Sequence, residues 1–319
     1  MPQPPFLLWA AAAAVAAAVA AAATPLVIRF ATWAGAIDHP RARRVHEVAT
    51  PLWGGIAIFL GVCASLLVTY AFWGGTLARE IPVLQITGIM LVATLIALLG
   101  AADDRYELRP LAKLVGQVVC ALLVVPFGVR IGGLFGIPLP GWLGSGLTVL
   151  WIVAVVNTIN FIDGLDGLAA GVSVIASLTF ALMAISQGKP AVAALALAVA
   201  GGAAGFLPYN FNPARIFMGD LGSHLLGFLL SVTAVIGVAK IAASVTIFSA
   251  MFALAVPILD TAWAVIRRSL SGKPIAVGDK GHLHHRLLDA GLSQRQAVLL
   301  IYALSGAFCL LAIWLLKTC

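Results

Sequence analysis

The stretch NTINFIDGLDGLAAG, residues 157–171, places polar side chains at every third position between two long apolar segments. These side chains are two carboxamides and two carboxylates: Asn157, Asn160, Asp163 and Asp166. On an ideal helix three residues advance by about 300°, so at most three of the four groups can converge on one ligand. Gly164 and Gly167 would let the backbone loosen and turn both carboxylates inward together. The alternative is a solvated turn in which Asp166 caps the next helix.

A second polar cluster, AADDRYELRPLAKLVGQ at residues 101–117, follows another apolar segment. Its carboxylates Asp103 and Asp104 are adjacent, and Pro110 is well placed to open a helix that carries Lys113 one turn in. Adjacent carboxylates repel each other, so the pair favours a bound cation or a proton on one member. The alternative is a charged loop that the neighbouring arginines neutralise.

A third cluster, YNFNPARIFMGDLGSHLLG at residues 209–227, sets Asp220 just before Gly222 and Ser223 at the expected start of a helix. Free amides at a helix N-terminus attract phosphate. A carboxylate there can hold Mg²⁺, whose waters and phosphate ligands complete an octahedron of oxygens. The alternative is again a helix cap. His224, one turn further on, fits a packing or hydrogen-bonding residue better than a ligand.

A fourth cluster, GDKGHLHHRLLDAGLSQRQ at residues 278–296, gathers four basic side chains within five positions: His282, His284, His285 and Arg286. Clustered histidines suggest zinc, but no cysteine is near. Lys280 and Arg286 flank the histidines with positive charge, which favours an anionic group instead. The four clusters together offer hard oxygen ligands for Mg²⁺ and Lys, Arg and His for phosphate. That combination suits phosphoryl transfer, in which a protein mainly positions groups and neutralises charge.

Composition places these clusters in a membrane protein. Of the 319 residues, 62% are hydrophobic and 10% are charged, against about 25% charged residues in a soluble domain. Apolar segments repeatedly reach the roughly 20 residues that a helix needs to cross the hydrocarbon core, without the alternation of barrel strands. We therefore expect an all-α, polytopic integral membrane protein with a single transmembrane domain over residues 1–319. About ten spans are predicted, at residues 6–28, 53–72, 83–101, 114–129, 142–158, 168–186, 190–208, 223–240, 244–266 and 297–316.

The positive charges are distributed unequally between the two sides that these spans create. One side holds 14 of the 19 Lys and Arg residues, in the connections 29–52, 102–113, 159–167, 209–222 and 267–296. By the positive-inside rule this side is cytoplasmic. Ten of the twelve carboxylates fall there too, so we expect a cytoplasmic active site and both termini outside. Topology and acidic ligands account for the net charge of +7 without a nucleic acid partner.

The ninth predicted span, residues 244–266, contains Pro257 and Asp260. Proline inside a helix predicts a kink or a break there. An acid within a membrane span is a functional candidate by default, and Asp260 lies about two turns before Arg267 on the same face. The alternative is a helix-to-helix hydrogen bond behind the site.

Four segments, DDRYELRPLAKLVGQ, NTINFIDGLDGLA, FNPARIFMGDLGS and HLHHRL, occur in this order on the predicted cytoplasmic side. They resemble the successive signature motifs of the polyprenyl-phosphate N-acetylhexosamine-1-phosphate transferases, of glycosyltransferase 4 type. The resemblance implies a multi-pass protein of the inner (cytoplasmic) membrane with about ten helices, often a homodimer. It also implies transfer of a sugar 1-phosphate from a UDP-N-acetylhexosamine to a polyprenyl phosphate in the bilayer, with release of UMP. The implied cofactor is Mg²⁺, for which Mn²⁺ can substitute.

The resemblance also implies roles for individual residues by motif match. Four aspartates match catalytic positions, the first two near the lipid phosphate and the last two near the nucleotide: Asp103, Asp104, Asp163 and Asp166. Two residues match Mg²⁺-binding positions: Asn160 and Asp220. Residues matched to substrate binding are Arg44, His46, Lys113, Asn157, His282, His284, His285 and Arg286.

Within the family, HLHHRL followed by GLSQRQAVLL resembles the branch that uses UDP-GlcNAc and undecaprenyl phosphate to start wall-polymer or surface-polysaccharide synthesis. The first connection, DHPRARRVHEVATPLWGG, resembles the same branch but departs from it at Val48 and Ala49, where lysine and proline are common. One alternative is the branch that uses UDP-MurNAc-pentapeptide. Another is a membrane transporter, which ten helices and a buried acid would suit, although the acids lie at the membrane edge and not at its midplane. A transferase for a nucleotide-activated alcohol would leave the histidines unexplained.

Overall fold

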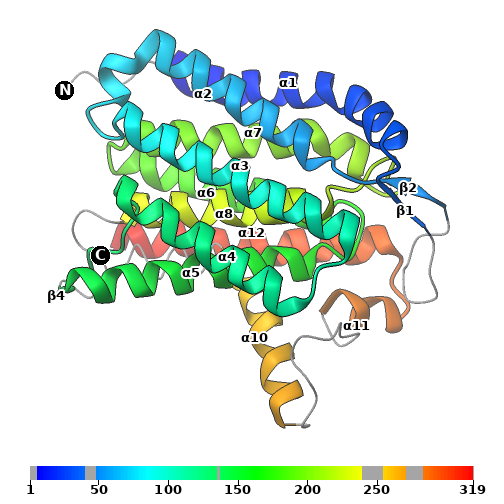
Figure 1. The fold of residues 1–319 in the computed structure, drawn as a ribbon. Helices are drawn as coiled ribbons and strands as arrows, with labels where there is room; N and C mark the ends of the chain where they lie inside the picture. The colour runs from blue at the N-terminus through cyan, green and yellow to red at the C-terminus, as the bar shows by residue number, and fades with distance from the viewer. Residues whose placement is uncertain (1–5, 40–47, 135–136, 239–253, 271–282, 319) are drawn as a thin grey trace.

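The computed structural model describes residues 6–39, 48–134, 137–238, 254–270 and 283–318. Over this part of the chain, long helices lie side by side along one common direction (Figure 1). The helices are α1 Phe6–Trp33, α2 Gly55–Leu77, α3 Val83–Tyr106, α4 Pro110–Val124, η1 Val125–Phe127, α5 Gly141–Ile162, α6 Leu168–Ser186, α7 Pro190–Asn210, α8 Gly219–Val238, α10 Ala255–Leu270, α11 Leu283–Asp289 and α12 Gln294–Thr318. The strands are β1 Ile37–Asp38, β2 Thr50–Pro51, β3 Gly133–Leu134 and β4 Ile137–Pro138.

Within the described residues, nine helices are long and apolar enough to cross a membrane, namely α1 to α8 and α12. The prediction of an all-α polytopic membrane protein is therefore confirmed. The ninth predicted span, residues 244–266, lies partly outside the described residues. Figure 1 places the start of α1 and the end of α12 at the same end of the bundle. The 16-residue α10, which follows α8 in the described part of the chain, is not among these nine helices.

Several helices continue about one turn beyond the predicted apolar spans at one end of the bundle. α3 carries Asp103 and Asp104, α4 carries Lys113, and α5 carries Asn160. We expected Asp103, Asp104 and Asn160 in connections, because the apolar pattern stops at the first polar residues. The helical main-chain hydrogen bonds continue past that point, where the polar side chains are hydrogen-bonded to residues of neighbouring helices. Lys113 lies one turn into the helix that Pro110 opens, as predicted. The polar clusters therefore lie on rigid helix ends.

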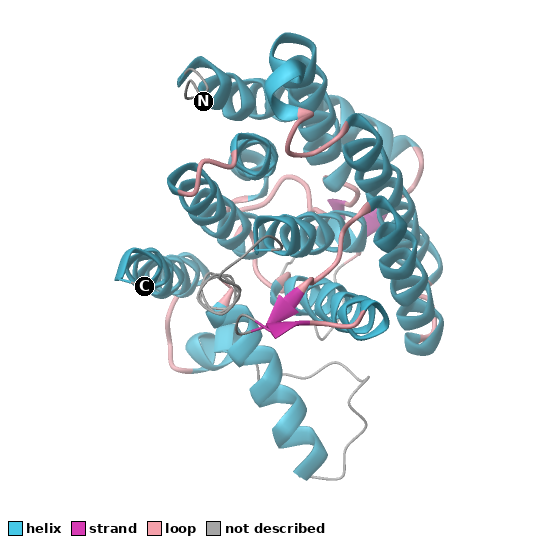
Figure 2. Cartoon of the chain, turned by 90° about the vertical axis from the view of Figure 1, so that its left-hand side faces the viewer, coloured by secondary structure: helices cyan, strands magenta, loops and turns pink. Residues whose placement is uncertain are grey.

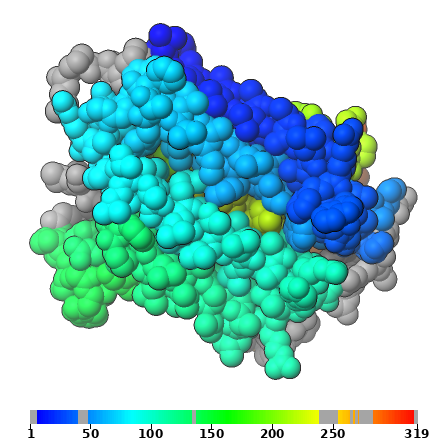
Figure 3. Space-filling model, turned by 45° about the horizontal axis from the view of Figure 1, so that its top comes forward, coloured from blue at the N-terminus to red at the C-terminus, as the bar shows by residue number. Residues whose placement is uncertain are grey.

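Helix α8 is the most enclosed of the described membrane-spanning helices. Its apolar window is 89% buried, compared with 28% for α1. α8 packs against α2, α3, α5, α6 and α7, and in the space-filling view it shows only through a small gap between α2 and α3 (Figure 3). The helix that begins with Gly219 and Asp220 is thus held on several sides.

Helix α1 packs closely on α2 and α7. The Ser65 hydroxyl of α2 donates a hydrogen bond to the Ala12 carbonyl of α1 at 2.7 Å. On α7, a methyl group at Gly201 would collide with the Ala13 carbonyl oxygen. Small residues let helix backbones approach in this way inside a membrane.

The antiparallel pair β1–β2 closes the polar end of the bundle. Asp38 lies opposite Thr50, and the Phe217 amide donates to the Pro51 carbonyl at 2.9 Å. This bond ties β2 to the segment that leads into α8. The first connection therefore delivers Asp38 to the same end as Asp220.

Helix α10 points away from the other helices in both cartoon views (Figure 1, Figure 2). It begins at Ala255, so Pro257 lies in its first turn, a position that proline tolerates. The side chains of Trp263 and Leu270 are exposed. Pro257 therefore lies at the start of a described helix, and the predicted kink within a longer span stays a prediction, since residues 239–253 lie outside the described residues.

We expect Gly201→Leu to lower the melting temperature of the detergent-solubilised protein, because the leucine side chain would be forced against the α1 backbone. The expected loss of stability is about 1–3 kcal/mol. The matched control is Gly146→Leu on α5, where an added side chain meets open space. Differential scanning fluorimetry on both variants tests this. Equal melting temperatures for the two variants would contradict the close α1–α7 packing.

Candidate active site

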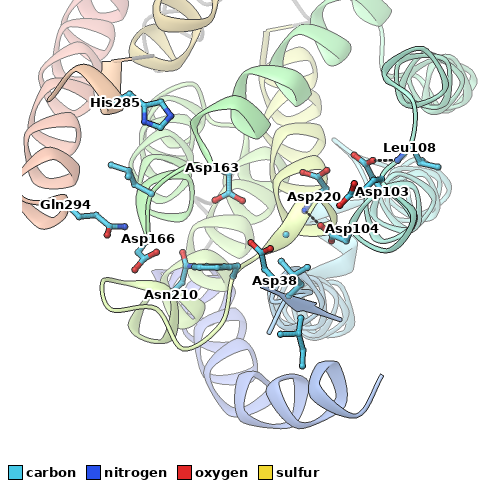
Figure 4. A pocket seen from close by; sticks show the side chains of 17 residues that line it. Asp38, Asp103, Asp104, Leu108, Asp163, Asp166, Asn210, Asp220, His285 and Gln294 are labelled. Carbon is cyan, nitrogen blue, oxygen red and sulfur yellow. Dashed lines mark hydrogen bonds between the residues drawn. The ribbon is translucent and has the colours of Figure 1, made fainter. Parts of the chain in front are cut away.

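A cavity of about 590 Å³ lies at the end of the bundle that β1 and α11 cover. Six aspartates line it: Asp38, Asp103, Asp104, Asp163, Asp166 and Asp220. Figure 4 shows these carboxylates around a common space, with His285 and Gln294 on the side opposite Asp103. The structure thus brings together residues from all four polar clusters of the sequence.

Asp103 holds the turn between α3 and α4. Its Oδ1 accepts a hydrogen bond from the Leu108 amide at 2.9 Å, and its Oδ2 lies 2.6 Å from Lys113 Nζ. Glu107, within this turn, adopts a left-handed conformation with φ of 46°. The carboxylate therefore fixes the reversal of the chain and positions the lysine.

Lys113, Asn160 and Asp220 form a polar triangle contributed by three helices. Lys113 Nζ lies 2.9 Å from Asp220 Oδ2 and 3.4 Å from Asn160 Oδ1. Asn160 Nδ2 donates to Asp220 Oδ1 at 2.5 Å and to Ser223 Oγ at 2.9 Å. The two residues that the sequence assigns to Mg²⁺, Asn160 and Asp220, are therefore direct neighbours.

Asp104 caps α8 from the neighbouring helix α3. Its two carboxylate oxygens accept the Asp220 amide at 2.8 Å and the Leu221 amide at 3.2 Å. Gly219 has φ of 71°, and a Cβ there would come within 2.5 Å of the Asp104 carboxylate. The amides that we expected to be free for phosphate thus donate to Asp104, as a carboxylate at a helix N-terminus favours.

Asp166 joins two connections and does not cap α6. Its Oδ2 accepts the Asn212 side-chain amide and the Ala214 main-chain amide, both at 3.0 Å. Asn212 also donates to Gln294 Oε1 at 2.8 Å. The N-cap of α6 is Gly167, with φ of 80°, so the capping alternative for Asp166 is wrong. This carboxylate orders the segment before α8.

Asp163 differs from the carboxylates around it. It is half-buried, and its carboxylate accepts no hydrogen bond from the described residues. Burial, followed by the nearby Asp220, Asp104 and Asp166 carboxylates, raises the pKa of Asp163 well above its usual range. A carboxylate in such surroundings is stabilised by an incoming cation.

The histidine-rich connection reaches the cavity through α11. His284 is buried against Gly164, where a Cβ would lie 2.6 Å from its Nε2. Its ring centroid lies 4.3 Å from that of His285, which lines the cavity. Arg286 is exposed. Three predicted substrate-binding residues lie outside the described residues: Arg44, His46 and His282.

Asp260 makes a hydrogen bond between elements behind the site. Its Oδ1 accepts the Leu283 amide, the first of α11, at 2.7 Å. This matches the helix-to-helix alternative considered for an acid in the ninth span. Asp260 stabilises the start of the segment that carries His284 and His285.

Two residues fall differently from the sequence-based expectation. Asn157, predicted to bind substrate, is hydrogen-bonded to Gln117 within the bundle, one turn of α5 deeper than Asn160. Asp38 lines the cavity and is only 6% exposed, yet the sequence analysis assigned it no role. Its position in DHPRARRVHEVATPLWGG was the available signal, because an acid in a connection on the same predicted side as the four polar clusters can fold back onto the site.

The donor atoms suit a hard cation. Asp220 and Asn160 offer adjacent oxygen ligands, and Asp163 faces the same cavity (Figure 4). Mg²⁺ is usually held by one or two carboxylates while waters and substrate phosphates complete its shell. Within the described residues, no group of three His, Cys, Asp or Glu is arranged to hold a metal by protein atoms alone. The residues present therefore fit Mg²⁺ bound together with a phosphate ligand.

Comparison with known proteins identifies the family. The family model described as glycosyl transferase family 4 matches residues 86–238, which include five of the six cavity aspartates. A Bacillus subtilis (strain 168) protein named "Probable undecaprenyl-phosphate N-acetylglucosaminyl 1-phosphate transferase" is 42% identical over 299 residues, covering 91% of this chain and 80% of that protein. The chain belongs to glycosyl transferase family 4. The resemblance inferred from the four motifs is confirmed.

Two further relatives differ from the Bacillus subtilis protein in the lipid or in the sugar for which they are named. A Mycolicibacterium smegmatis "Decaprenyl-phosphate N-acetylglucosaminephosphotransferase" is 35% identical over 317 residues, covering 88% of this chain and 74% of that protein. A Desulforudis audaxviator "Phospho-N-acetylmuramoyl-pentapeptide-transferase" is 34% identical over 299 residues, covering 86% of this chain and 87% of that protein. The family-model match over residues 86–238 contains α4 to α8 and most of α3.

We expect Asp163→Asn to raise the melting temperature at pH 8 when divalent cations are absent. In the presence of Mg²⁺, we expect the same variant to reduce turnover more than 100-fold. A carboxyl whose pKa is raised by folding destabilises the fold increasingly above its unfolded pKa of about 3.9. The gain should therefore shrink when both proteins are melted at pH 5. Asp289→Asn, at an exposed site on α11, is the control. A lower melting temperature for Asp163→Asn would reveal a stabilising contact of this carboxylate.

Proposed function

We propose that this chain transfers N-acetylglucosamine 1-phosphate from UDP-GlcNAc to undecaprenyl phosphate, forming undecaprenyl-diphosphate-GlcNAc and UMP. The observation that carries this proposal is the 42% identity, over 91% of the chain, with a relative named for that transfer. Identity with the relative named for the muramoyl-pentapeptide reaction is 34%. The lipid-linked sugar would initiate a cell-wall or surface polysaccharide.

The reaction needs positioning more than a strong base. An oxygen of the lipid phosphate attacks the phosphorus that bears the sugar, the phosphorus–oxygen bond to UMP breaks, and UMP leaves. A phosphate monoester has its second pKa near about 6, so the nucleophile is already largely ionised. Asp103 and Asp104 both have protein partners, Lys113 and the α8 amides. We therefore infer that they orient the groups around the lipid phosphate.

Asp220 and Asn160 would hold Mg²⁺, or Mn²⁺ in its place, with Asp163 facing the same space. The bound ion supplies neutralisation of the diphosphate charge and orientation of the leaving group. Lys113 is paired with both Asp103 and Asp220. When a cation binds Asp220, the Lys113 ammonium group can turn toward a substrate phosphate. His285 supplies a second nitrogen donor at the cavity wall.

We infer that the cavity opens to the cytoplasm of a cell whose inner membrane holds the protein, and that the protein acts as a homodimer. The connections at the cavity end hold most of the Lys and Arg residues, as the positive-inside rule requires of the cytoplasmic side. The start of α1 and the end of α12 lie at the opposite end (Figure 1). Both termini would then be outside.

This orientation predicts the activity of alkaline phosphatase fusions, because the reporter is active only outside the cytoplasm. A fusion after residue 139, in the connection before α5, should be active. A fusion after residue 212, in the connection before α8, should be inactive. The reverse pattern would place the cavity on the outer face and contradict the proposal.

The function is tested by UMP release from purified protein with Mg²⁺ and undecaprenyl phosphate, offered UDP-GlcNAc or UDP-MurNAc-pentapeptide in parallel. We expect release from UDP-GlcNAc only, and a loss of at least 100-fold in Asp220→Ala. Release only from the pentapeptide substrate would keep the chemistry and assign the chain to the other branch. No release from either, with movement of a solute across vesicles, would support the transporter.

A further inference from the structure

Below the triangle of Lys113, Asn160 and Asp220 lies a second polar triangle on the same three helices. Its members are one helical turn deeper in the bundle: Gln117 on α4, Asn157 on α5 and His224 on α8. Each therefore lies on the same helix face as the residue above it, three or four positions away. The side chains of Gln117 and His224 are fully buried.

The deeper triangle is one connected hydrogen-bond network. His224 Nδ1 lies 2.7 Å from the Asp220 carbonyl oxygen, and His224 Nε2 lies 2.9 Å from Gln117 Nε2. Asn157 Nδ2 donates to Gln117 Oε1 at 2.6 Å and to the Val153 carbonyl at 2.8 Å. Both ends of the network are thus main-chain carbonyl groups, which only accept.

These two ends determine the direction of every bond. Because the Asp220 carbonyl accepts, His224 Nδ1 carries the hydrogen, and Nε2 of the neutral ring then accepts from the Gln117 amide. Because the Val153 carbonyl accepts, Asn157 must present its amide nitrogen there and cannot be flipped. Gln117 Oε1 must therefore face Asn157. The network has one arrangement in which all its bonds are made.

We propose that Gln117, Asn157 and His224 are positioning residues that set the rotation of α4, α5 and α8 so that the triangle above them converges on a divalent cation. Hydrogen bonds between helices add to van der Waals packing in determining which helix faces meet inside a membrane. The proposal rests on the proposed function, since it assigns Asn160 and Asp220 to the cation. Partners that orient metal ligands typically change metal affinity or activity by about 10–100-fold when they are lost.

The test measures Mg²⁺ binding without substrate, as the Mg²⁺-dependent rise in melting temperature. For His224→Leu and for Asn157→Leu, we expect the midpoint of this rise to require about 10–100-fold more Mg²⁺ than wild type. The double variant should add little to the worse single variant, because both break one network. His224→Gln, whose amide can reach Gln117, should lie closer to wild type than His224→Leu.

Ser231→Ala is the matched control, because Ser231 is a buried polar residue further along α8 whose hydroxyl donates to the Phe228 carbonyl outside the network. The Mg²⁺ midpoint of Ser231→Ala should equal that of wild type. Wild-type midpoints for His224→Leu and Asn157→Leu, or equal effects of His224→Gln and His224→Leu, would overturn the proposal. If one leucine variant does not fold, the other and His224→Gln give the same comparison. Because the readout needs no turnover, failure of UMP release in wild type would overturn the proposed function separately.

Discussion

The structure of the site depends on how Asp220 is neutralised at the end of an apolar bundle. Its amide donates to Asp104 of α3, and its carboxylate meets Lys113 of α4 and Asn160 of α5. A charge left unpaired among apolar helices is costly, so partners must be supplied from every side. This requirement explains why the helices extend about one turn past their apolar spans. The cavity is the space left where these polar ends meet.

Four of the other carboxylates around the cavity are of two kinds. Asp103, Asp104 and Asp166 accept main-chain amides and so fix the connections that surround the ligand. Asp163 accepts no hydrogen bond within the described residues, and burial raises its pKa. A site for phosphoryl transfer needs both kinds, since rigid walls position the substrates while an uncompensated charge attracts a cation.

The remaining wall comes from segments distant in sequence. Asp260 of α10 accepts the Leu283 amide, and this bond holds the start of α11 where His284 packs on Gly164. The β1–β2 pair brings Asp38 in from the first connection. Three separate parts of the chain therefore cover the bundle end, which allows the cavity to enclose a substrate with several charged groups.

The sequence by itself determined the membrane class, the positions of the described spans and the gathering of the four polar clusters at one end. These follow from hydropathy and spacing, which are properties of short continuous segments. Only the tertiary structure decided that Asp104 caps α8, that Asp166 joins two connections, and that Asn157 belongs to a deeper network. For Asp104 and Asp166 the partners are 46 to 117 residues away in the chain, and for Asn157 the partner is on a neighbouring helix. A hydrogen-bond partner on another helix leaves no mark in local sequence pattern, because any of several polar residues could satisfy the same group.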